Sequence, residues 1–486
     1  MWGAATRRHP VRKNRGGAVT QPGTAEHPLR VAIIGAGPAG FFTAQHLLAR
    51  TDVVVSVDLF ERLPTPFGLV RFGVAPDHEE IKRVVRTFEK TAARPAFRFF
   101  GNVDYGRQVI LEDLKRHYHQ VCFTTGAQTD RRLGVPGEDL AGSHPATEFV
   151  AWYNGHPDFR GCRFDLSVER VAVVGVGNVA VDVARILCRT PEELATTDIA
   201  DYALHALRAS RVREVIMLGR RGPVQAAFTN PELKELGELA GAEVSVRPDE
   251  IVPDPLSQAE LERSDERRTL DRKLEILREF AGQRPTGKPR RLVLRFLVSP
   301  VEVIGDAKGR VAKLRVARNR LITDGKGGLK AEPTGETEEL PVGLIFRSVG
   351  YHGIALPGLP FEERRGVVPN QHGRVVDPGT GQPLPGLYVA GWIKRGPSGV
   401  IGTNKPDALE TVESMLEDRA SGRVLLPSSP EPAAAEATVR AREPRCVSYA
   451  DWCRLDRLEQ ERGKPAGRPR VKLTSVEDML AALRGA

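Results

Sequence analysis

Two glycine-rich segments have the residue types and the spacing that bind phosphate groups. Residues 31–40 read VAIIGAGPAG, and residues 171–180 read VAVVGVGNVA, with Ala180 at the third glycine position. In each, glycines after an apolar run permit a tight turn and let backbone N–H groups approach a pyrophosphate at a helix N-terminus. One match is weak, but two, each after an expected strand, predict two dinucleotides. A flavin and a nicotinamide that exchange electrons would account for both.

The strand that follows each glycine turn ends in a residue that discriminates nucleotides. Glu61 ends the first, where an acid holds the ribose hydroxyls of a dinucleotide, although a solvated glutamate is the alternative. Arg220 and Arg221 end the second, where an NAD site would have an acid. Guanidinium groups bind phosphate in a bidentate way, so the pair favours NADPH over NADH, unless it is a solvated pair.

Three further residues could contact the nicotinamide or relay a proton. His78 closes a long segment, residues 62–78, that has neither helical nor strand periodicity, and such loops are often functional. Asp182 lies one turn into the second fingerprint helix, and Glu232 begins a later helix. A helix-capping histidine and two helix-surface acids are the alternatives. A Gly-rich turn around Trp392 would place one more helix N-terminus at a ligand.

Composition describes a globular chain long enough for two or three domains. It has 486 residues, 41% of them hydrophobic, and a net charge of +9. No apolar run reaches the roughly 20 residues of a membrane span. The five cysteines form no CxxC pair, which argues against a redox disulfide, zinc or iron–sulfur site, and no metal is expected. A charged stretch, residues 257–281, is either a solvated helix face or a docking patch for an acidic partner, with candidates Arg267, Arg268, Arg272 and Lys273.

Strands alternate with helices along the chain, which predicts an α/β fold with two Rossmann-like domains. The expected strands are 30–34, 53–60, 97–103, 169–174, 212–218, 291–304, 310–319 and 336–349. The expected helices are 38–50, 79–93, 178–189, 198–208, 257–281, 404–419 and 448–461, with a last one opened by a capping box at Thr474–Glu477. Residues 1–29, rich in Arg, Gly and Pro, are expected to be a disordered extension, or else a mitochondrial transit peptide.

These motifs together resemble the adrenodoxin-reductase-like ferredoxin–NADP+ reductases. The shared segments are residues 35–40, 66–78, 134–139, 149–156, 177–185, 219–223 and 391–401. The resemblance covers about residues 30–420, and the long 66–78 segment is its most specific part. The tail beyond residue 420 departs from the shorter mitochondrial members and resembles the bacterial branch, which favours a bacterial cytoplasm.

The resemblance implies a glutathione-reductase-like arrangement in which an NADPH domain is inserted into an FAD domain. The implied boundaries are 30–129 and 350–424 for FAD, 130–349 for NADPH, and 425–486 for a linker and C-terminal extension. The implied FAD contacts are Gly35, Gly37, Pro38, Ala39, Gly40, Glu61, Leu69, Tyr105, Trp392, Gly399, Val400 and Ile401. The implied NADP contacts are Val176, Gly177, Asn178, Val179, Arg220, Arg221, Glu232 and Gly399. Tyr105 stands where the family usually has valine, so that contact would be through the backbone.

The implied activity is transfer of a hydride from NADPH to FAD, followed by single electrons to an acidic ferredoxin that supplies an oxygenase or cytochrome P450. A disulfide reductase would need the missing cysteine pair. A reductase module like the small subunit of glutamate synthase would need iron–sulfur cysteine clusters. A non-catalytic FAD/NADP-binding redox sensor is a third alternative, since it would bind both cofactors without turning over.

Overall fold

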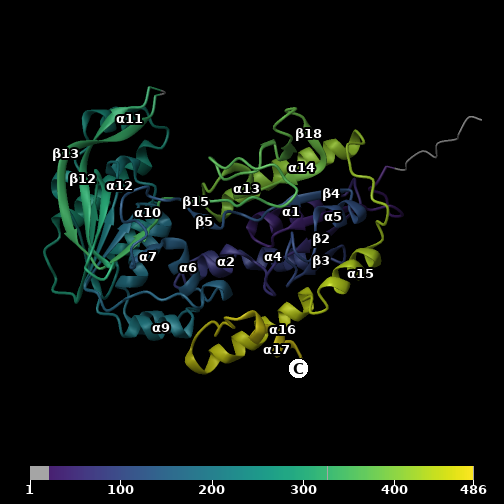
Figure 1. Ribbon diagram of the computed structural model, residues 1–486, viewed down its shortest axis with the longest axis horizontal. Helices are drawn as coiled ribbons and strands as arrows, with labels where there is room; N and C mark the ends of the chain where they lie inside the picture. The colour runs from purple at the N-terminus through teal and green to yellow at the C-terminus, as the bar shows by residue number, and fades with distance from the viewer. Residues whose placement is uncertain (1–20, 326, 485–486) are drawn as a thin grey trace, which may run out of the picture.

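Two sheet-centred bodies lie side by side in the computed structural model, which describes residues 21–325 and 327–484 (Figure 1). The first body is built on a seven-stranded sheet of order β16-β17-β18-β4-β1-β2-β3. Its strands are β1 (Leu29–Ile34), β2 (Val55–Phe60), β3 (Phe97–Phe100), β4 (Gln120–Phe123), β16 (Asn370–Gln371), β17 (Arg374–Val376) and β18 (Pro383–Val389). Strands β18, β4, β1, β2 and β3 run parallel, as a doubly wound sheet requires.

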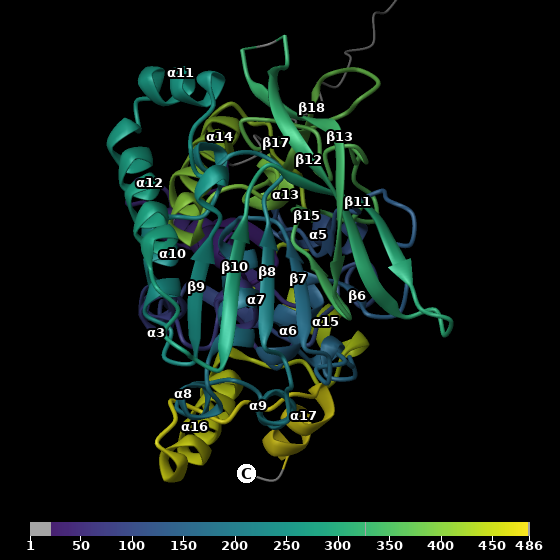
Figure 2. The ribbon, with the colours of Figure 1, turned by 90° about the vertical axis from the view of Figure 1, so that its left-hand side faces the viewer.

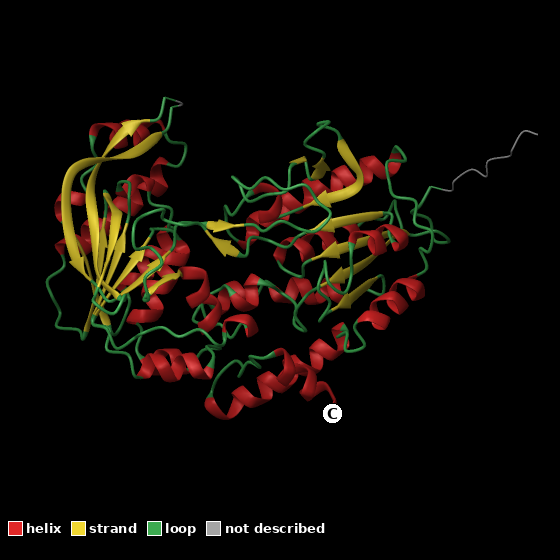
Figure 3. Ribbon diagram, in the orientation of Figure 1, coloured by secondary structure: helices red, strands yellow, loops and turns green. Residues whose placement is uncertain are grey.

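Helices cover both faces of this sheet (Figure 3). They are α1 (Pro38–Leu48), α2 (Leu69–Phe72), α3 (Glu79–Lys82), α4 (Val85–Ala92), α5 (Leu111–His117), α13 (Trp392–Arg395) and α14 (Asn404–Ala420). The core under α1 and α14 contains Phe41, Phe88 and Met415, all fully buried. Apolar side chains on both faces explain why the strands read as continuous hydrophobic runs.

The second body is built on a parallel six-stranded sheet of order β6-β14-β7-β8-β10-β9 (Figure 2). Its strands are β6 (Ser143–Pro145), β7 (Arg170–Val174), β8 (Glu214–Leu218), β9 (Ala242–Val246), β10 (Arg290–Arg295) and β14 (Leu344–Arg347). The accompanying helices are α6 (Ala146–Tyr153), α7 (Asn178–Cys188), α8 (Pro191–Ala195), α9 (Asp201–Arg208), α10 (Asn230–Gly237), α11 (Pro255–Arg263) and α12 (Arg267–Gly282). A separate antiparallel sheet joins β11 (Val298–Gly305), β12 (Val311–Thr323) and β13 (Leu329–Pro341).

The chain leaves the first sheet after β4, builds the second body and then returns. The two crossings, β5 (Thr129–Asp130) and β15 (Tyr351–His352), pair with each other as a short antiparallel ribbon. We call this pair the crossing ribbon. The fold class expected from the sequence, with one dinucleotide domain inserted into another, is thereby confirmed.

The chain ends in an arm that runs along both bodies (Figures 1 and 2). This segment contains α15 (Pro432–Arg442), α16 (Tyr449–Gly463) and α17 (Val476–Arg484). We call its last part, residues 448–484, the C-terminal arm. Trp452 and Leu455 of α16 join the core of the first body. The capping box expected at Thr474 is wrong by one residue, because Ser475 Oγ accepts a hydrogen bond from Asp478 N at 3.0 Å.

Several expected elements are divided in the structure. The strand expected over 291–304 is β10 and β11 in two different sheets, separated at Leu297, whose φ is 56°. Likewise 336–349 contains the end of β13 and β14, 79–93 contains α3 and α4, and 257–281 contains α11 and α12. Apolar residues lie within the first three of these breaks, at 296–297, 342–343 and 83–84, so periodicity alone did not show them. The break between α11 and α12 falls in the polar run Ser264–Glu266.

The extension expected over residues 1–29 lies, up to residue 20, outside the described residues. Residues 21–28 are packed against α14: Gln21 Nε2 donates to the backbone oxygen of Arg419 at 2.7 Å, and Arg419 Nε donates to that of Pro22 at 2.6 Å. For this stretch the expectation of disorder is wrong.

Candidate functional site: two dinucleotide turns facing a shared joint

The first glycine turn, between β1 and α1, has the geometry of a pyrophosphate cradle. Gly35 has a φ of 108°, where a side chain is strained. A Cβ on Gly40 would lie 2.1 Å from Gly35 O, so only glycine lets the helix pack on the strand. A Cβ on Gly37 would meet no atom within 4 Å, which leaves open space above the N-terminus of α1. These are the three glycine roles of the dinucleotide fingerprint.

The aperiodic segment 62–78 lies directly against this turn. Phe67 N donates to Ala36 O at 2.8 Å, and a Cβ on Gly68 would lie 2.9 Å from Gly37 Cα. Phe67 has a φ of 83°, and such strain in a non-glycine residue persists where the surroundings impose it, often at ligand sites. Thr65 Oγ1 is buried without a hydrogen-bond partner. The unused hydroxyl and the open turn both fit a polar ring system.

Glu61 points back at the same turn from the end of β2. Its carboxylate accepts hydrogen bonds from Ala36 N at 2.9 Å and Leu63 N at 3.1 Å. Burial raises its pKa, and the two amides act in the opposite direction. The carboxylate is therefore held in a fixed position beside the turn, which suits a ribose ligand.

The return segment after β18 completes this side of the site. Gly391 is so close to α1 that a Cβ there would lie 2.6 Å from Ala39 Cβ. The Trp392 indole donates from Nε1 to Ser398 O at 3.1 Å, and its ring centroid lies 5.1 Å from that of Tyr351. Val400 is 54% exposed, which is unusual for valine. The fold thus brings the 35–40 turn and the Trp392 segment together.

Two more residues from the expected FAD set lie at the edges of this region. Tyr105 donates its hydroxyl to Pro357 O at 2.6 Å and packs edge-on against Phe123. The hydroxyl and the ring of Tyr105 are both engaged by other residues of the protein. Any contact of Tyr105 with a ligand would therefore be made by its backbone. Leu69 begins α2, inside the aperiodic segment.

The second glycine turn, between β7 and α7, repeats the geometry of the first. Gly175 has a φ of 136°, and a Cβ there would lie 2.1 Å from Ser348 O. A Cβ on Gly177 would again meet nothing within 4 Å. Asn178 Oδ1 accepts from Thr229 N at 3.0 Å, so this side chain fixes the loop before α10. The turn lies beside the strand β14 that leads back to the crossing ribbon.

Arg220 and Arg221 follow β8 beside this second turn. Across residues 21–325 and 327–484, neither guanidinium has an ion pair or a side-chain hydrogen bond. The backbone is fixed instead: Arg220 O accepts from Asn319 Nδ2 at 2.8 Å, and Arg221 O accepts from Leu297 N at 3.1 Å. Two uncommitted guanidinium groups on a fixed backbone can bind a phosphate.

The three candidate catalytic residues, which come from three separate elements, meet at the joint between the bodies. His78 precedes α3, Asp182 is on α7 and Glu232 is on α10. His78 Nδ1 lies 3.8 Å from Asp182 Oδ1, and His78 Nε2 lies 3.8 Å from Glu232 Oε2. A residue that the sequence did not indicate is nearer, because Glu235 Oε2 lies 2.8 Å from His78 Nε2.

Arg185 organises this cluster from a fully buried position on α7. It donates to Asp182 at 2.6 Å, to Glu232 at 3.2 Å and to Asp77 at 2.8 Å. Its side chain is 0% exposed, so these acids supply the counter-charge that a buried cation requires. Asp77 belongs to the aperiodic segment, and the cluster therefore joins the first body to α7 and α10 of the second.

The cluster shifts the protonation of its members. Burial raises the pKa of Asp182 to about 6, opposed by Arg185 and reinforced by Glu232. Burial lowers the pKa of His78, but the hydrogen bond to Glu235 and the adjacent carboxylates outweigh it, so the net shift is upward. A carboxyl and an imidazole whose pKa values are both raised, lying beside one another, suit a proton relay.

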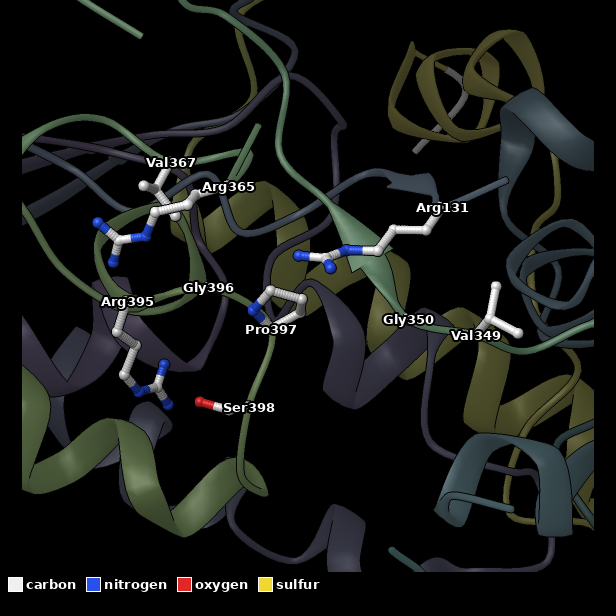
Figure 4. Close-up of a pocket in the computed structure, with 9 residues that line it drawn as sticks. All are labelled: Arg131, Val349, Gly350, Arg365, Val367, Arg395, Gly396, Pro397 and Ser398. Atoms are coloured by element: carbon white, nitrogen blue, oxygen red, sulfur yellow. The ribbon is translucent and has the colours of Figure 1, made fainter. Parts of the chain in front are cut away.

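A basic pocket of about 360 Å³ opens between the crossing ribbon and the Trp392 segment (Figure 4). Arg131, Arg365 and Arg395 line it together with Val349–Gly350 and residues 396–398. Arg395 Nη1 is buried without a hydrogen-bond partner. Arg395 Nε lies 3.9 Å from Asp407 Oδ1, whereas in the described part of the chain the Arg131 side chain has no ion pair. The sequence did not indicate this pocket, since its arginines come from positions far apart in the chain.

One of the four residues expected to form a docking patch on α12 is not on the surface. Lys273 is 6% exposed, and its ammonium donates to Ala226 O at 2.5 Å, so it faces the core of the second body. Arg267, Arg268 and Arg272 are exposed. Arg272 pairs with Glu275 at 2.9 Å and Arg267 approaches Asp271 at 3.6 Å, which leaves Arg268 as the least neutralised of the three.

Comparison with known proteins agrees with this geometry. The family model of the pyridine nucleotide-disulphide oxidoreductases matches residues 29–221. The NADPH-ferredoxin reductase FprA of Mycobacterium tuberculosis is 46% identical over 461 residues, covering 93% of this chain and 98% of its own. Its structure in complex with NADPH has a TM-score of 0.87 and 45% identity, covering 94% of this chain and all of its own.

The human mitochondrial NADPH:adrenodoxin oxidoreductase is 43% identical over 472 residues, covering 95% of this chain and 93% of its own. Because residues 425–486 exceed the remaining 5% of 486 residues, this relative shares at least part of the tail. The expectation that the tail separates bacterial from mitochondrial members is therefore wrong.

The fold and the two turns define a two-dinucleotide flavoprotein oxidoreductase. At this identity and coverage the chain belongs to the family of NADPH–ferredoxin reductases and adrenodoxin reductases. Among the described residues all five cysteines are free, and no helix there is long and apolar enough to cross a membrane.

Proposed function

We propose that this protein is an NADPH-dependent flavoprotein reductase that delivers electrons to a ferredoxin-type iron–sulfur protein. The observation that carries the proposal is the pair of open glycine turns on either side of one joint, with uncommitted Arg220 and Arg221 at the second turn. When bound, NADPH supplies a hydride and FAD accepts it and releases electrons singly. With no cysteine pair at hand in the described residues, the electrons must leave to an external acceptor.

The residues present fit both cofactors. The 35–40 turn, Glu61, Leu69, the Tyr105 backbone and residues 392 and 399–401 would hold FAD. Residues 176–179 would hold the pyrophosphate of NADPH, and Arg220 and Arg221 its 2′-phosphate. Glu232 and Gly399 would lie near its nicotinamide. The basic pocket lies along the path from the second turn to Trp392, so we assign Arg131 and Arg395 to the phosphate on the nicotinamide side.

The chain's own residues orient the reactants and control protons rather than forming covalent bonds. Arg185 and Asp77 fix the aperiodic segment against α7, so they set the distance between the two sites. His78, Asp182 and Glu232 would position the nicotinamide and relay the proton that accompanies flavin reduction. The Trp392 ring, held by Ser398 and Tyr351, would exclude water from the reacting face.

The partner we propose is an acidic ferredoxin that docks on a basic surface including Arg267, Arg268 and Arg272 of α12. Long-range attraction would accelerate its binding and would weaken as salt is added. We place the protein in a bacterial cytoplasm on its resemblance to bacterial relatives. The mitochondrial alternative depends on a transit peptide, most of which would fall outside the described residues.

The deciding test is cytochrome c reduction by the FAD-loaded protein with NADPH or NADH, each with and without a ferredoxin. A rate that prefers NADPH and requires ferredoxin supports the proposal. Flavin bleaching by NADPH without any effect of ferredoxin would refute the partner. If NADPH failed to bleach the flavin, the redox-sensor alternative would replace the reductase.

A further inference from the structure

The C-terminal arm meets both bodies at one buried group of charges. Glu459 on α16 is 0% exposed and accepts two hydrogen bonds from Arg71, at 2.9 and 2.6 Å. It also accepts from Leu473 N at 2.8 Å. Arg71 lies in α2, inside the aperiodic segment that also carries Leu69 and His78. A bidentate, charge-assisted pair of this kind is strong and directional.

Lys472 extends the same group into the second body. Its side chain is 1% exposed, and its ammonium donates to Arg71 O at 3.2 Å and to Asn154 O at 3.1 Å and lies 3.1 Å from Asp198 Oδ2. The other oxygen of Asp198 pairs with Lys82 at 2.6 Å. Burial lowers the pKa of Lys472 to about 7, and Asp198 favours its charged form. One nitrogen atom therefore touches α2 of the first body and two segments of the second.

A neighbouring arginine of the arm holds the same part of the second body. Arg468 donates from Nε to Thr197 O at 2.8 Å and from its other nitrogens to Ile199 O and to Asp201. Ile199 belongs to the core of the second body. The contacts of Arg468 with residues 197–201 therefore attach the C-terminal arm to that core.

The contacts of Glu459, Lys472 and Arg468, which we call the arm joint, lie where they can control the distance between the two cofactor sites. The crossing ribbon pairs only two residues of each strand, so it can act as a hinge. The C-terminal arm lies at the opposite end of the contact between the bodies, below the ribbon in both views (Figures 1 and 2). If one body rotated about the crossing ribbon relative to the other, the largest displacement would therefore occur at the arm joint.

We infer that Glu459 and Lys472 are positioning residues for the transfer step: by joining Arg71 to Asp198 they hold the nicotinamide site at its working distance from the flavin site. This inference rests on the proposed function. A misplacement of about 1 Å between reacting groups costs on the order of 100-fold in rate, so a joint far from the chemistry can control it.

The test separates the two halves of the reaction in FAD-loaded Glu459→Gln and Lys472→Met. Stopped-flow bleaching of the flavin by saturating NADPH should slow by about tenfold or more. Reoxidation of the photoreduced flavin by ferricyanide needs no nicotinamide site and should stay within about twofold. Hydrogen exchange of the oxidised enzyme should rise in both 69–72 and 197–201. Arg442→Met is the matched control, because among the described residues Arg442 joins the tail only to the first body, at Asp113 and at Gln108 O, and it should leave all three readouts unchanged.

Bleaching rates within about twofold of the parent in both variants would overturn the inference. So would a slowing of both half-reactions in proportion to lost FAD, which would indicate simple destabilisation. Unchanged hydrogen exchange in both segments would refute the role of Glu459 and Lys472 in holding the two bodies together, whatever the outcome for the proposed function. Failure of the proposed function would show separately, as a parent enzyme whose flavin NADPH does not bleach.

Discussion

Coenzyme preference should depend on Arg220 and Arg221, and the structure gives the size of the effect. Both guanidinium groups lack ion pairs in the described chain, so a 2′-phosphate would gain charge-assisted hydrogen bonds without breaking others. Such bonds contribute about 1.5–3 kcal/mol each, and about 1.4 kcal/mol is tenfold in affinity. Replacement of either arginine by alanine should therefore weaken NADPH by roughly 10- to 100-fold. Arg221 is half-buried and Arg220 exposed, so the loss should be larger at Arg221.

The assay is kcat/KM for flavin-dependent cytochrome c reduction with each coenzyme. NADH lacks the 2′-phosphate, so its kcat/KM should change by less than about twofold. Arg213→Ala is the matched control: it removes an exposed positive charge just before β8, at the opposite end of the strand from Arg220. Equal losses with NADPH and NADH, or an Arg213→Ala effect as large as that of Arg221→Ala, would refute the reasoning.

Four further predictions concern the cluster and the partner. Bleaching by NADPH should fall as pH increases through about 6, where Asp182 loses the proton that the relay would deliver to the reduced flavin, and Asp182→Asn should abolish this step; an unchanged profile would remove Asp182 from the relay. Because its pKa is raised from 3.8, Asp182 stabilises the fold below pH 3.8 and loses that contribution as pH rises through 6, which acid denaturation can measure. Arg185→Met should lower the free energy of unfolding by about 3–5 kcal/mol, since it leaves buried carboxylates unpaired; thermal unfolding with no shift would contradict this. Ferredoxin-dependent rates should fall with salt, and Arg268→Ala should reduce that dependence whereas Lys273→Met should not.

The glycine turns could be predicted because their requirements are local. Gly35 and Gly175 have positive φ angles that favour glycine, and a Cβ on Gly40 would collide with Gly35 O in the same turn. The spacing of the glycines in the sequence is therefore enough to identify the turns. The order of strands and helices followed from similarly local patterns, whereas the insertion of one domain into the other was implied by the family resemblance.

What the sequence left unpredicted depends on contacts between distant segments. Arg185 reads as an ordinary helix arginine until Asp77, more than a hundred residues earlier, is placed beside it. The charged stretch 257–281 predicts a surface position for Lys273, yet this residue lies on the buried face of α12 with Leu277 and Phe280. Its spacing of four and seven residues from these apolar side chains was the available signal. Arg131 and Arg395 are brought into one pocket only by the return of the chain.

The crossing ribbon has a consequence for how this architecture can be recombined. Because β5 and β15 pair, the inserted domain begins and ends at the same place, and a graft between relatives would need to match only Thr129–Asp130 and Tyr351–His352 at its seam. A chimera must also preserve the contacts between the C-terminal arm and the inserted domain, since Lys472 and Arg468 contact residues 197–201. Chimeras that exchange residues 131–350 should therefore work best when the donor also supplies the C-terminal arm.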